Sequence, residues 1–188
     1  MKRYLSTLVM CGVLLGSSSA FALGTFGIRL GTGLSFYDGD VTPEPEVTPF
    51  AIGASWLLDL SVVELEIDAL YWRDSAEVSA MGVTGEQTFN YIATPAIARA
   101  SFGLIPKLLS ISVGGGLEPR FLISADPELV ESSTKSTVMY LPISMIAKLN
   151  LAVITVGVEV RYEYQLTDRF EGSSDKYNQL VFMGGIDF

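Results

Sequence analysis

Histidine is absent from this 188-residue chain, and its single cysteine, Cys11, lies near the amino terminus. Without histidine the chain cannot build a Ser-His-Asp triad or the usual histidine-ligated zinc sites. A single cysteine excludes an intrachain disulfide. Charged residues make up only 18% of the chain, against about 25% in an average soluble protein. These absences remove the commonest routes to catalysis and leave a chain that is poor in charge.

The charges that are present are mostly acidic, with 21 Asp and Glu against 12 Lys and Arg and a net charge of −9 at pH 7. The basic residues are scattered and form no stripe that could neutralise phosphates, so we predict no nucleic-acid partner. Apolar residues make up 49% of the chain, which excludes a disordered protein. The length fits one domain. The fold must therefore keep a large apolar surface away from water without a long core helix.

The first 22 residues have the features of a secretory signal peptide. Lys2 and Arg3 form a positive start, residues 5–15 are apolar, and Ala20-Phe21-Ala22 is a triplet that signal peptidase accepts. We predict residues 1–22 as the signal and residues 23–188 as one exported domain, whose net charge becomes −11 once Lys2 and Arg3 are removed. Cleavage also removes Cys11. No later segment approaches about 20 uninterrupted apolar residues, so we expect no transmembrane helix.

After residue 22, apolar and polar residues alternate with a period of two, which is typical of β-strands with two different faces. The clearest run is 154–164, where Ile, Val and Tyr alternate with Thr, Gly, Glu and Arg. Most segments are longer than the roughly five or six residues usual in a soluble sheet. Eight segments are predicted as strands: 26–36, 50–59, 63–71, 88–101, 110–121, 137–149, 154–164 and 177–188.

The connections between these segments alternate in length. Residues 37–48, 73–87, 123–136 and 167–176 are long and rich in Asp, Glu, Pro, Ser and Gly, whereas those near 60–61, 103–107 and 150 are short. Bacterial outer-membrane barrels have short turns at one end and long loops at the other. We therefore predict an all-β fold, an eight-stranded antiparallel up-and-down transmembrane β-barrel.

Sorting the strand residues by parity separates charge from apolar character. A charge at the middle of a bilayer costs roughly 2–4 kcal/mol for Arg or Lys, so a lipid-facing set should exclude charge, as the apolar set does. The other set is rich in Gly, Ser and Ala, which leave space in a narrow interior. Its charged members are Arg29, Asp59, Glu64, Glu66, Asp68, Arg99, Glu118, Arg120, Lys148, Glu159, Arg161, Glu163 and Asp187. We predict that this set faces inward and closes the interior with salt bridges; the alternative is a soluble exported barrel that buries the apolar set.

Aromatic residues of the apolar set lie mainly near strand ends, as in the girdles at the two membrane interfaces. They are Phe26, Phe36, Phe50, Tyr71, Phe102, Phe121, Tyr162, Tyr164 and Phe188. The carboxyl-terminal run 182–188 also places apolar residues at alternate positions and ends on phenylalanine. Both features favour a barrel whose outer face meets lipid.

With the signal sequence, the eight alternating segments and this last run, the exported chain resembles the small eight-stranded outer-membrane β-barrel superfamily, the OmpA/OmpX/OmpW-like porin-family barrels. The resemblance implies the cell outer membrane of a Gram-negative-type cell, outer-membrane lipid around the barrel, and the barrel-assembly machinery as a partner during insertion. The terminal positions that fit its recognition signal are Phe182, Gly184, Ile186 and Phe188. The family motif places its glycine one position before Gly184. The superfamily shares architecture more than function, so no catalytic or binding residue is carried over.

We predict a monomeric, non-enzymatic barrel with a structural or surface-interaction role, such as envelope integrity or adhesion, and with no cofactor or metal. The enzymatic outer-membrane barrels of the lipid A acyltransferase, lipid A deacylase, phospholipase and omptin types use a histidine, which is absent here. The alternative is narrow-channel or lateral transport of small solutes, which an apolar pocket near Trp72 and Leu122 would favour. The acidic segment 38–46 has oxygen ligands for a divalent cation, but we interpret it as a solvated loop. Residues 114–116, three glycines within a strand, do not form a phosphate loop.

Overall fold

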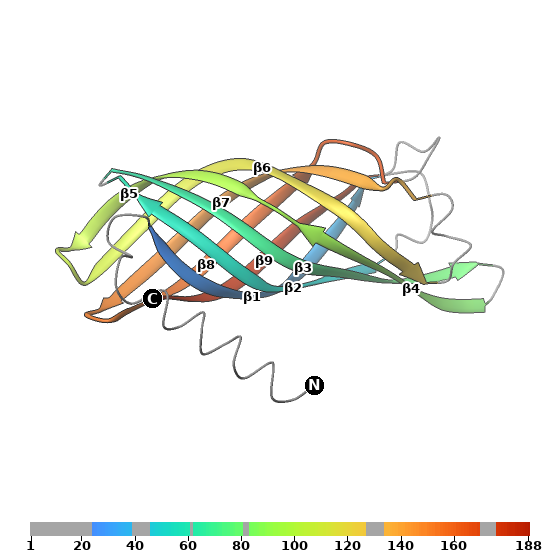
Figure 1. The fold of residues 1–188 in the computed structure, drawn as a ribbon. Coiled ribbons are helices and arrows are strands. Elements are labelled where there is room, and N and C mark those ends of the chain that lie inside the picture. The colour runs from blue at the N-terminus through green and yellow to red at the C-terminus, as the bar shows by residue number, and fades with distance from the viewer. Residues whose placement is uncertain (1–23, 39–45, 61, 81–82, 127–133, 170–175) are drawn as a thin grey trace, which may run out of the picture.

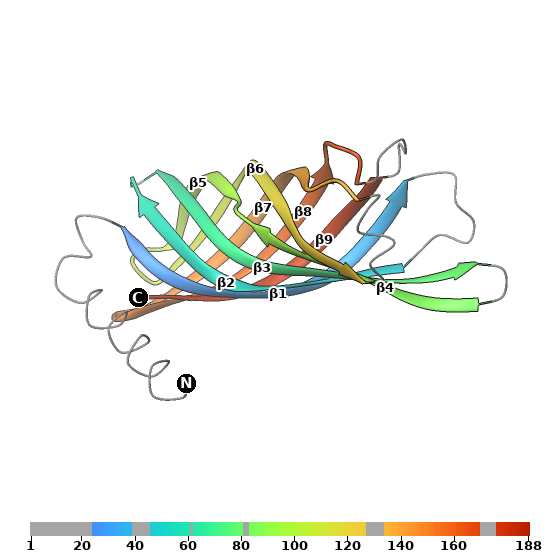
Figure 2. The same ribbon diagram turned by 45° about the vertical axis from the view of Figure 1, so that its right-hand side comes forward.

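The computed structural model describes residues 24–38, 46–60, 62–80, 83–126, 134–169 and 176–188. In this part of the chain, nine strands form one antiparallel sheet that closes on itself (Figure 1, Figure 2). They are β1 (Thr25–Asp38), β2 (Glu46–Asp59), β3 (Val63–Ala80), β4 (Val83–Ala93), β5 (Ala96–Ile105), β6 (Leu109–Asp126), β7 (Thr137–Leu151), β8 (Ile154–Gln165) and β9 (Lys176–Asp187). No helix among these residues is long and apolar enough to cross a membrane. The predicted signal peptide, residues 1–22, lies outside the described residues.

Strands β4 and β5 are two parts of one wall strand, so the barrel is eight-stranded. Both pair with β3 on one side and with β6 on the other. They are separated at Thr94 and Pro95, because proline has no backbone N–H to donate to the ladder. Hydrogen bonding continues across the break: Thr94 N donates to Pro119 O and Asp68 N donates to Pro95 O, both at 3.0 Å. The predicted eight-stranded antiparallel barrel is confirmed.

The first and last strands close the wall. Strand β1 pairs with β2 on one side and with β9 on the other, in a register that runs from Gly27 opposite Asp187 to Asp38 opposite Lys176. The backbone N–H of Phe188 donates to Phe26 O at 2.8 Å, next to this seam. Closure leaves no open sheet edge, which is the condition for a β-structure to span lipid.

Strands β2, β5, β7 and β9 end at one end of the barrel, and β1, β3, β6 and β8 end at the opposite one (Figure 1). We call these the short-turn end and the long-loop end. The prediction of a loop over residues 73–87 is wrong, because β3 and β4 stay paired up to Ala80 opposite Val83. A hairpin that extends beyond the lipid needs no apolar alternation, so the period of two fades while the backbone pairing continues.

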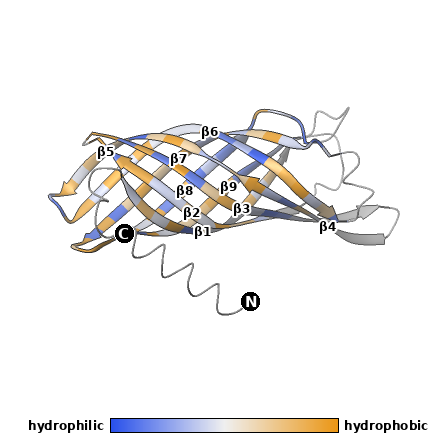
Figure 3. Cartoon of the chain, in the orientation of Figure 1, coloured by the Kyte–Doolittle hydropathy of each residue, from blue (hydrophilic) through white to orange (hydrophobic). Residues whose placement is uncertain are grey.

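Hydrophobic and hydrophilic residues alternate along the strands (Figure 3), and the exposed side chains of the outward face are largely apolar. Phe26 and Ile28 are each 56% exposed and Val158 is 63% exposed. All nine aromatic residues predicted for this face are exposed, from Phe26 near the start of β1 to Phe188. Where the structure describes side chains of the strands, half-buried or exposed charges are few: Asp59, Asp126 and Lys176 lie at strand ends, and Arg73 lies within β3. The inward and outward sets of the wall therefore differ as sharply as a lipid-facing barrel requires.

Candidate functional site

Eleven of the thirteen charged residues predicted to face inward form the interior charge network of the barrel. Each is at most 4% exposed and each makes at least one ion pair. They are Arg29, Glu64, Glu66, Asp68, Arg99, Glu118, Arg120, Lys148, Glu159, Arg161 and Glu163. Asp187 also points inward, but Asp59, which the parity assigned to the interior, is exposed where β2 ends. At the end of a strand, a side chain can be exposed to solvent even when its position in the alternation points inward.

Ten buried charged side chains form one continuous chain of ion pairs along the barrel. From the short-turn end to the long-loop end they are Asp187, Arg29, Glu66, Arg99, Glu159, Arg161, Glu118, Arg120, Asp74 and Arg169. The distances between charged atoms range from 2.5 Å, for Arg169 with Asp74, to 3.9 Å, for Arg120 with Asp74. Asp68 branches from this chain at Arg161, and Glu163 branches at Arg120.

Several of these pairs cross the interior rather than joining neighbouring strands. The order of strands places β8 opposite β3, and Arg161 Nη2 of β8 lies 3.3 Å from Asp68 Oδ2 of β3. Near the short turns, Lys148 Nζ of β7 lies 2.6 Å from Glu64 Oε2 of β3. An eight-stranded barrel has an interior just wide enough for side chains to fill. Charged side chains thus bridge the interior at two levels of β3.

Inward glycines leave room for the long side chains. A Cβ at Gly185 would lie 2.5 Å from Arg29 Nη1, and a Cβ at Gly31 would lie 2.7 Å from Met183 Cγ. In the glycine run of β6, Cβ atoms at Gly114 and Gly116 would overlap backbone carbonyls of β5. The glycines of this run therefore allow a close approach of two strands.

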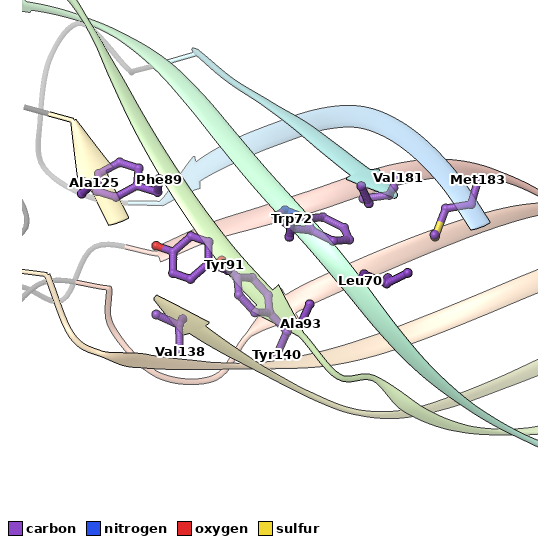
Figure 4. Close-up of a cluster of buried hydrophobic side chains, with 11 residues drawn as sticks. Leu70, Trp72, Phe89, Tyr91, Ala93, Ala125, Val138, Tyr140, Val181 and Met183 are labelled. Carbon is purple, nitrogen blue, oxygen red and sulfur yellow. The ribbon is translucent and has the colours of Figure 1, made fainter. Parts of the chain in front are cut away.

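Towards the long-loop end the interior becomes aromatic and apolar (Figure 4). The buried cluster there consists of Ala51, Leu70, Trp72, Phe89, Tyr91, Ala93, Ala125, Val138, Tyr140, Val181 and Met183, with Leu122 packed against it. Arg120 reaches into this cluster, with its Cζ 3.7 Å from the Trp72 ring centroid and 3.9 Å from that of Tyr140. Trp72 and Leu122, named above as borders of a possible apolar pocket, are thus members of a packed cluster that contains a guanidinium group.

Two charged residues of the interior, Asp74 and Arg169, lie in segments that the sequence pattern assigns to loops. Arg169 Nη2 donates to Asp74 Oδ2 at 2.5 Å and to the Tyr140 hydroxyl at 3.1 Å. Asp74 Oδ1 accepts from Trp72 Nε1 at 2.9 Å and from Gln179 Nε2 at 3.0 Å. Asp74 continues the inward parity of β3, so that parity is a signal that could have found it.

Arg169 has no comparable signal, because it follows the last strand position of β8 and belongs to no alternating pattern. Burial alone would lower its pKa, but Tyr91, Tyr140 and Asp74 outweigh that effect and hold the pKa above its ordinary value. Arg169 therefore remains a cation inside the barrel mouth, although it is only 1% exposed.

Phe182, Gly184, Ile186 and Phe188 share the outward face of the carboxyl-terminal segment, and all four are exposed. In the part of the chain that the structure describes, no group of three or more Asp, Glu or Cys side chains is arranged to hold a metal ion. Residues 39–45 of the acidic first connection lie outside that part.

Comparison with known proteins rests on structure, because neither a family model nor a curated protein sequence matches the chain. The chain is similar to Neisserial surface protein A, with a TM-score of 0.55 and 12% identity over 87% of this chain and 97% of that one. It also matches the N-terminal β-barrel domain of Pseudomonas aeruginosa OprF, with a TM-score of 0.41 and 15% identity over 88% of this chain and 98% of that one. The fold is that of the small eight-stranded outer-membrane β-barrels, as the sequence resemblance implied.

Proposed function

We propose that this protein is an integral outer-membrane barrel with a closed interior and a structural or surface-interaction role in the cell envelope. The observation that carries the proposal is the continuous chain of buried ion pairs, from which a branch at Arg161 reaches Asp68 on the opposite wall. The apolar outward face supports the location, with outer-membrane lipid as its surroundings. The described part of the chain gives no reason to prefer transport or catalysis.

Membrane fractionation tests the location. We expect the protein to stay with outer-membrane fragments through high-salt and alkaline washes, and to leave them only in detergent, because its outward side chains are apolar around the whole wall. Removal of Phe188 from the carboxyl end should reduce insertion if the assembly machinery reads that end. Release of the intact protein without detergent would overturn the membrane location and favour a soluble exported barrel.

Planar-bilayer recording tests the closed interior. The purified protein should give no stable conductance steps, since charged side chains bridge the interior at the Lys148–Glu64 and Arg161–Asp68 pairs. The quadruple variant Glu64→Ala, Lys148→Ala, Asp68→Ala, Arg161→Ala, which removes both bridging pairs, should conduct more than the wild type. The matched control is Lys135→Ala, which removes a cation whose side chain is 35% exposed outside the strands. Stable large steps from the unmodified protein would favour the transport alternative instead.

The role in the envelope is tested in cells. Deleting the gene should increase entry of a large apolar dye or reduce attachment to surfaces, and the wild-type gene should restore both. The buried ion pairs stabilise the barrel, so a gene that carries Arg161→Ala should restore dye exclusion and attachment less than the wild-type gene does. If dye entry and attachment are unchanged by deletion, the proposed role is wrong, whatever the bilayer recordings show.

A further inference from the structure

At the long-loop end of the barrel, three aromatic rings and one carboxylate lie around the guanidinium group of Arg169. The guanidinium carbon of Arg169 lies 4.7 Å from the ring centroid of Tyr177, 5.1 Å from that of Phe89 and 5.8 Å from that of Tyr91. A cation within about 6 Å of an aromatic face is attracted by the ring quadrupole. One carboxylate oxygen, Asp74 Oδ2, accepts a hydrogen bond from the same guanidinium at 2.5 Å.

The walls of this site are held by contacts that do not involve Arg169. Two side chains of the barrel wall, Trp72 and Gln179, donate to the other oxygen of Asp74 at 2.9 and 3.0 Å. The Tyr140 hydroxyl donates to Gln165 Oε1 at 3.2 Å. Phe89 and Tyr91 stack with their ring centroids 6.5 Å apart. Carboxylate and rings are therefore positioned by strands, as a preformed site requires.

One polar group in the site has no partner of its own. The Tyr91 hydroxyl is buried, and among the residues that the structure describes no hydrogen-bond partner lies within reach of it. An unsatisfied buried hydroxyl carries a desolvation cost that a ligand donor or a bound water would relieve. The site thus retains an unused hydrogen-bonding group beside the cation.

The cation that fills the site comes from outside the wall. Arg169 lies beyond the end of β8, and its carbonyl accepts from Lys135 N at 2.8 Å. The neighbouring ion pair, Lys135 Nζ with Asp168 Oδ2, is 3.5 Å long and its side chains are 35% and 36% exposed. Exposed pairs of this kind add little stability. The occupant is therefore carried on a connection, whereas Asp74 and the aromatic rings of the site lie on strands.

We propose that the barrel mouth is a binding site for guanidinium or quaternary ammonium groups, and that Arg169 is its built-in occupant. The three aromatic faces and one carboxylate suit a flat or rounded organic cation. In the wild-type chain, Arg169 competes with any external cation for this site, because the chain holds Arg169 there at high effective concentration. Removing or withdrawing Arg169 exposes the site to an external ligand.

The test uses Arg169→Ala in the purified full chain in detergent. It is combined with Trp56→Phe, so that Trp72 is the only tryptophan in the chain. Trp72 reports on the site because its indole N–H donates to Asp74. Titration with methylguanidinium or tetramethylammonium should give a saturable change in Trp72 emission. Urea, the neutral counterpart of guanidinium, should give none at the same concentration. The chain that keeps Arg169 should respond at least roughly tenfold more weakly.

A second substitution separates this site from unspecific effects of salt. Asp74→Asn in the Arg169→Ala background removes the carboxylate charge and should weaken methylguanidinium binding by at least roughly tenfold. Tetramethylammonium has no N–H to donate, so its binding should depend more on the rings and fall strongly with Tyr177→Ala. Two results would overturn the proposal. One is equal methylguanidinium binding by the Arg169→Ala chains with and without Asp74→Asn. The other is a folded Arg169→Ala chain whose Trp72 emission shows no saturable change.

Refolding yield keeps the proposal testable if Arg169→Ala folds poorly. Ligands that bind only the folded state raise its population. Methylguanidinium should then increase the yield of folded Arg169→Ala barrel, and urea at the same concentration should not. A yield that responds to neither, or to both alike, contradicts the cation site without bearing on the closed interior, which bilayer recording of the unmodified chain tests separately.

Discussion

The two halves of the barrel interior hold buried cations by different means. In the half near the short turns, Arg29, Arg99 and Arg161 are paired with carboxylates. In the half near the long loops, Arg120 and Arg169 also meet carboxylates, but their guanidinium groups lie over aromatic rings as well. We call these the charged half and the aromatic half.

The difference follows from what the wall contributes at each level. Inward positions of the charged half include small residues such as Gly185, Ser55 and Ser144, so long charged side chains cross the space that these leave. Ser144 Oγ itself accepts from Arg99 Nε at 2.7 Å. In the aromatic half, Trp72 and Tyr140 fill the same diameter with rings. A cation that loses one hydrogen bond is still attracted by a nearby aromatic ring. A buried charge that loses its counter-ion has no other partner. The charged half should therefore be the more sensitive to single substitutions.

Arg161→Ala should have the largest effect, because it leaves a carboxylate of the charged half without a counter-ion. Arg161 is fully buried and makes the ion pair of Asp68 at 3.3 Å, while Glu118 and Glu159 have further arginine partners. Breaking a buried pair by removing one member costs about 3–5 kcal/mol. Urea unfolding of the barrel in lipid vesicles, followed by tryptophan fluorescence, measures the loss.

The matched variant for that experiment is the double substitution Arg161→Ala, Asp68→Asn. It removes the stranded carboxylate and should recover part of the lost stability. A loss below about 1 kcal/mol for Arg161→Ala alone, of the size seen for exposed pairs, would contradict a desolvated network.

Gly185→Val should have the next largest effect, since it forces bulk into the space that Arg29 occupies. A Cβ at this position would lie 2.5 Å from Arg29 Nη1 and 2.9 Å from its Cδ. Overpacking of a filled interior costs about 1–3 kcal/mol. The neighbouring Gly184 faces outward, where a Cβ would meet nothing within 4 Å. Gly184→Val is therefore the control, and in the same urea series an equal loss for both variants would remove the argument that inward glycines make room.

The sequence pattern predicts the charged half much better than the aromatic half. Of the thirteen charges that parity assigns to the interior, all but Asp59 are buried, and the arginines Arg29, Arg99 and Arg161 of the charged half are among them, because a strand residue must face either lipid or the interior. The strand count also follows from this alternation, although Pro95 divides one wall strand into β4 and β5. What parity cannot supply is the partner of each charge, since the pairs join strands that are distant in sequence, as with Lys148 and Glu64.

Around Asp74 the outward face of the aromatic half is no longer strictly apolar, because the outward neighbour Arg73 is exposed. There the polar stretch after Trp72 reads as a loop, although β3 continues to Ala80 and Asp74 keeps its inward direction. Arg169 enters the interior from a connection, and a residue outside the strands has no period that reveals its direction. Its role depends on tertiary contacts with Asp74 and Tyr140, which no local pattern encodes.

Trp72→Phe should have the smallest of the three effects, because it removes one hydrogen bond from the aromatic half and keeps the ring. Asp74 Oδ1 loses the Trp72 Nε1 donor but still accepts from Gln179, and Asp74 Oδ2 keeps Arg169. A hydrogen bond to a charged group contributes about 1.5–3 kcal/mol, and with partners that remain the loss should lie at or below the lower limit. The urea series, followed by circular dichroism, gives this loss, and Trp56→Phe on the outer wall is the control for loss of an indole. A cost as large as that of Arg161→Ala would show that the rings do not buffer the cations, and that the two halves hold their charges by the same means.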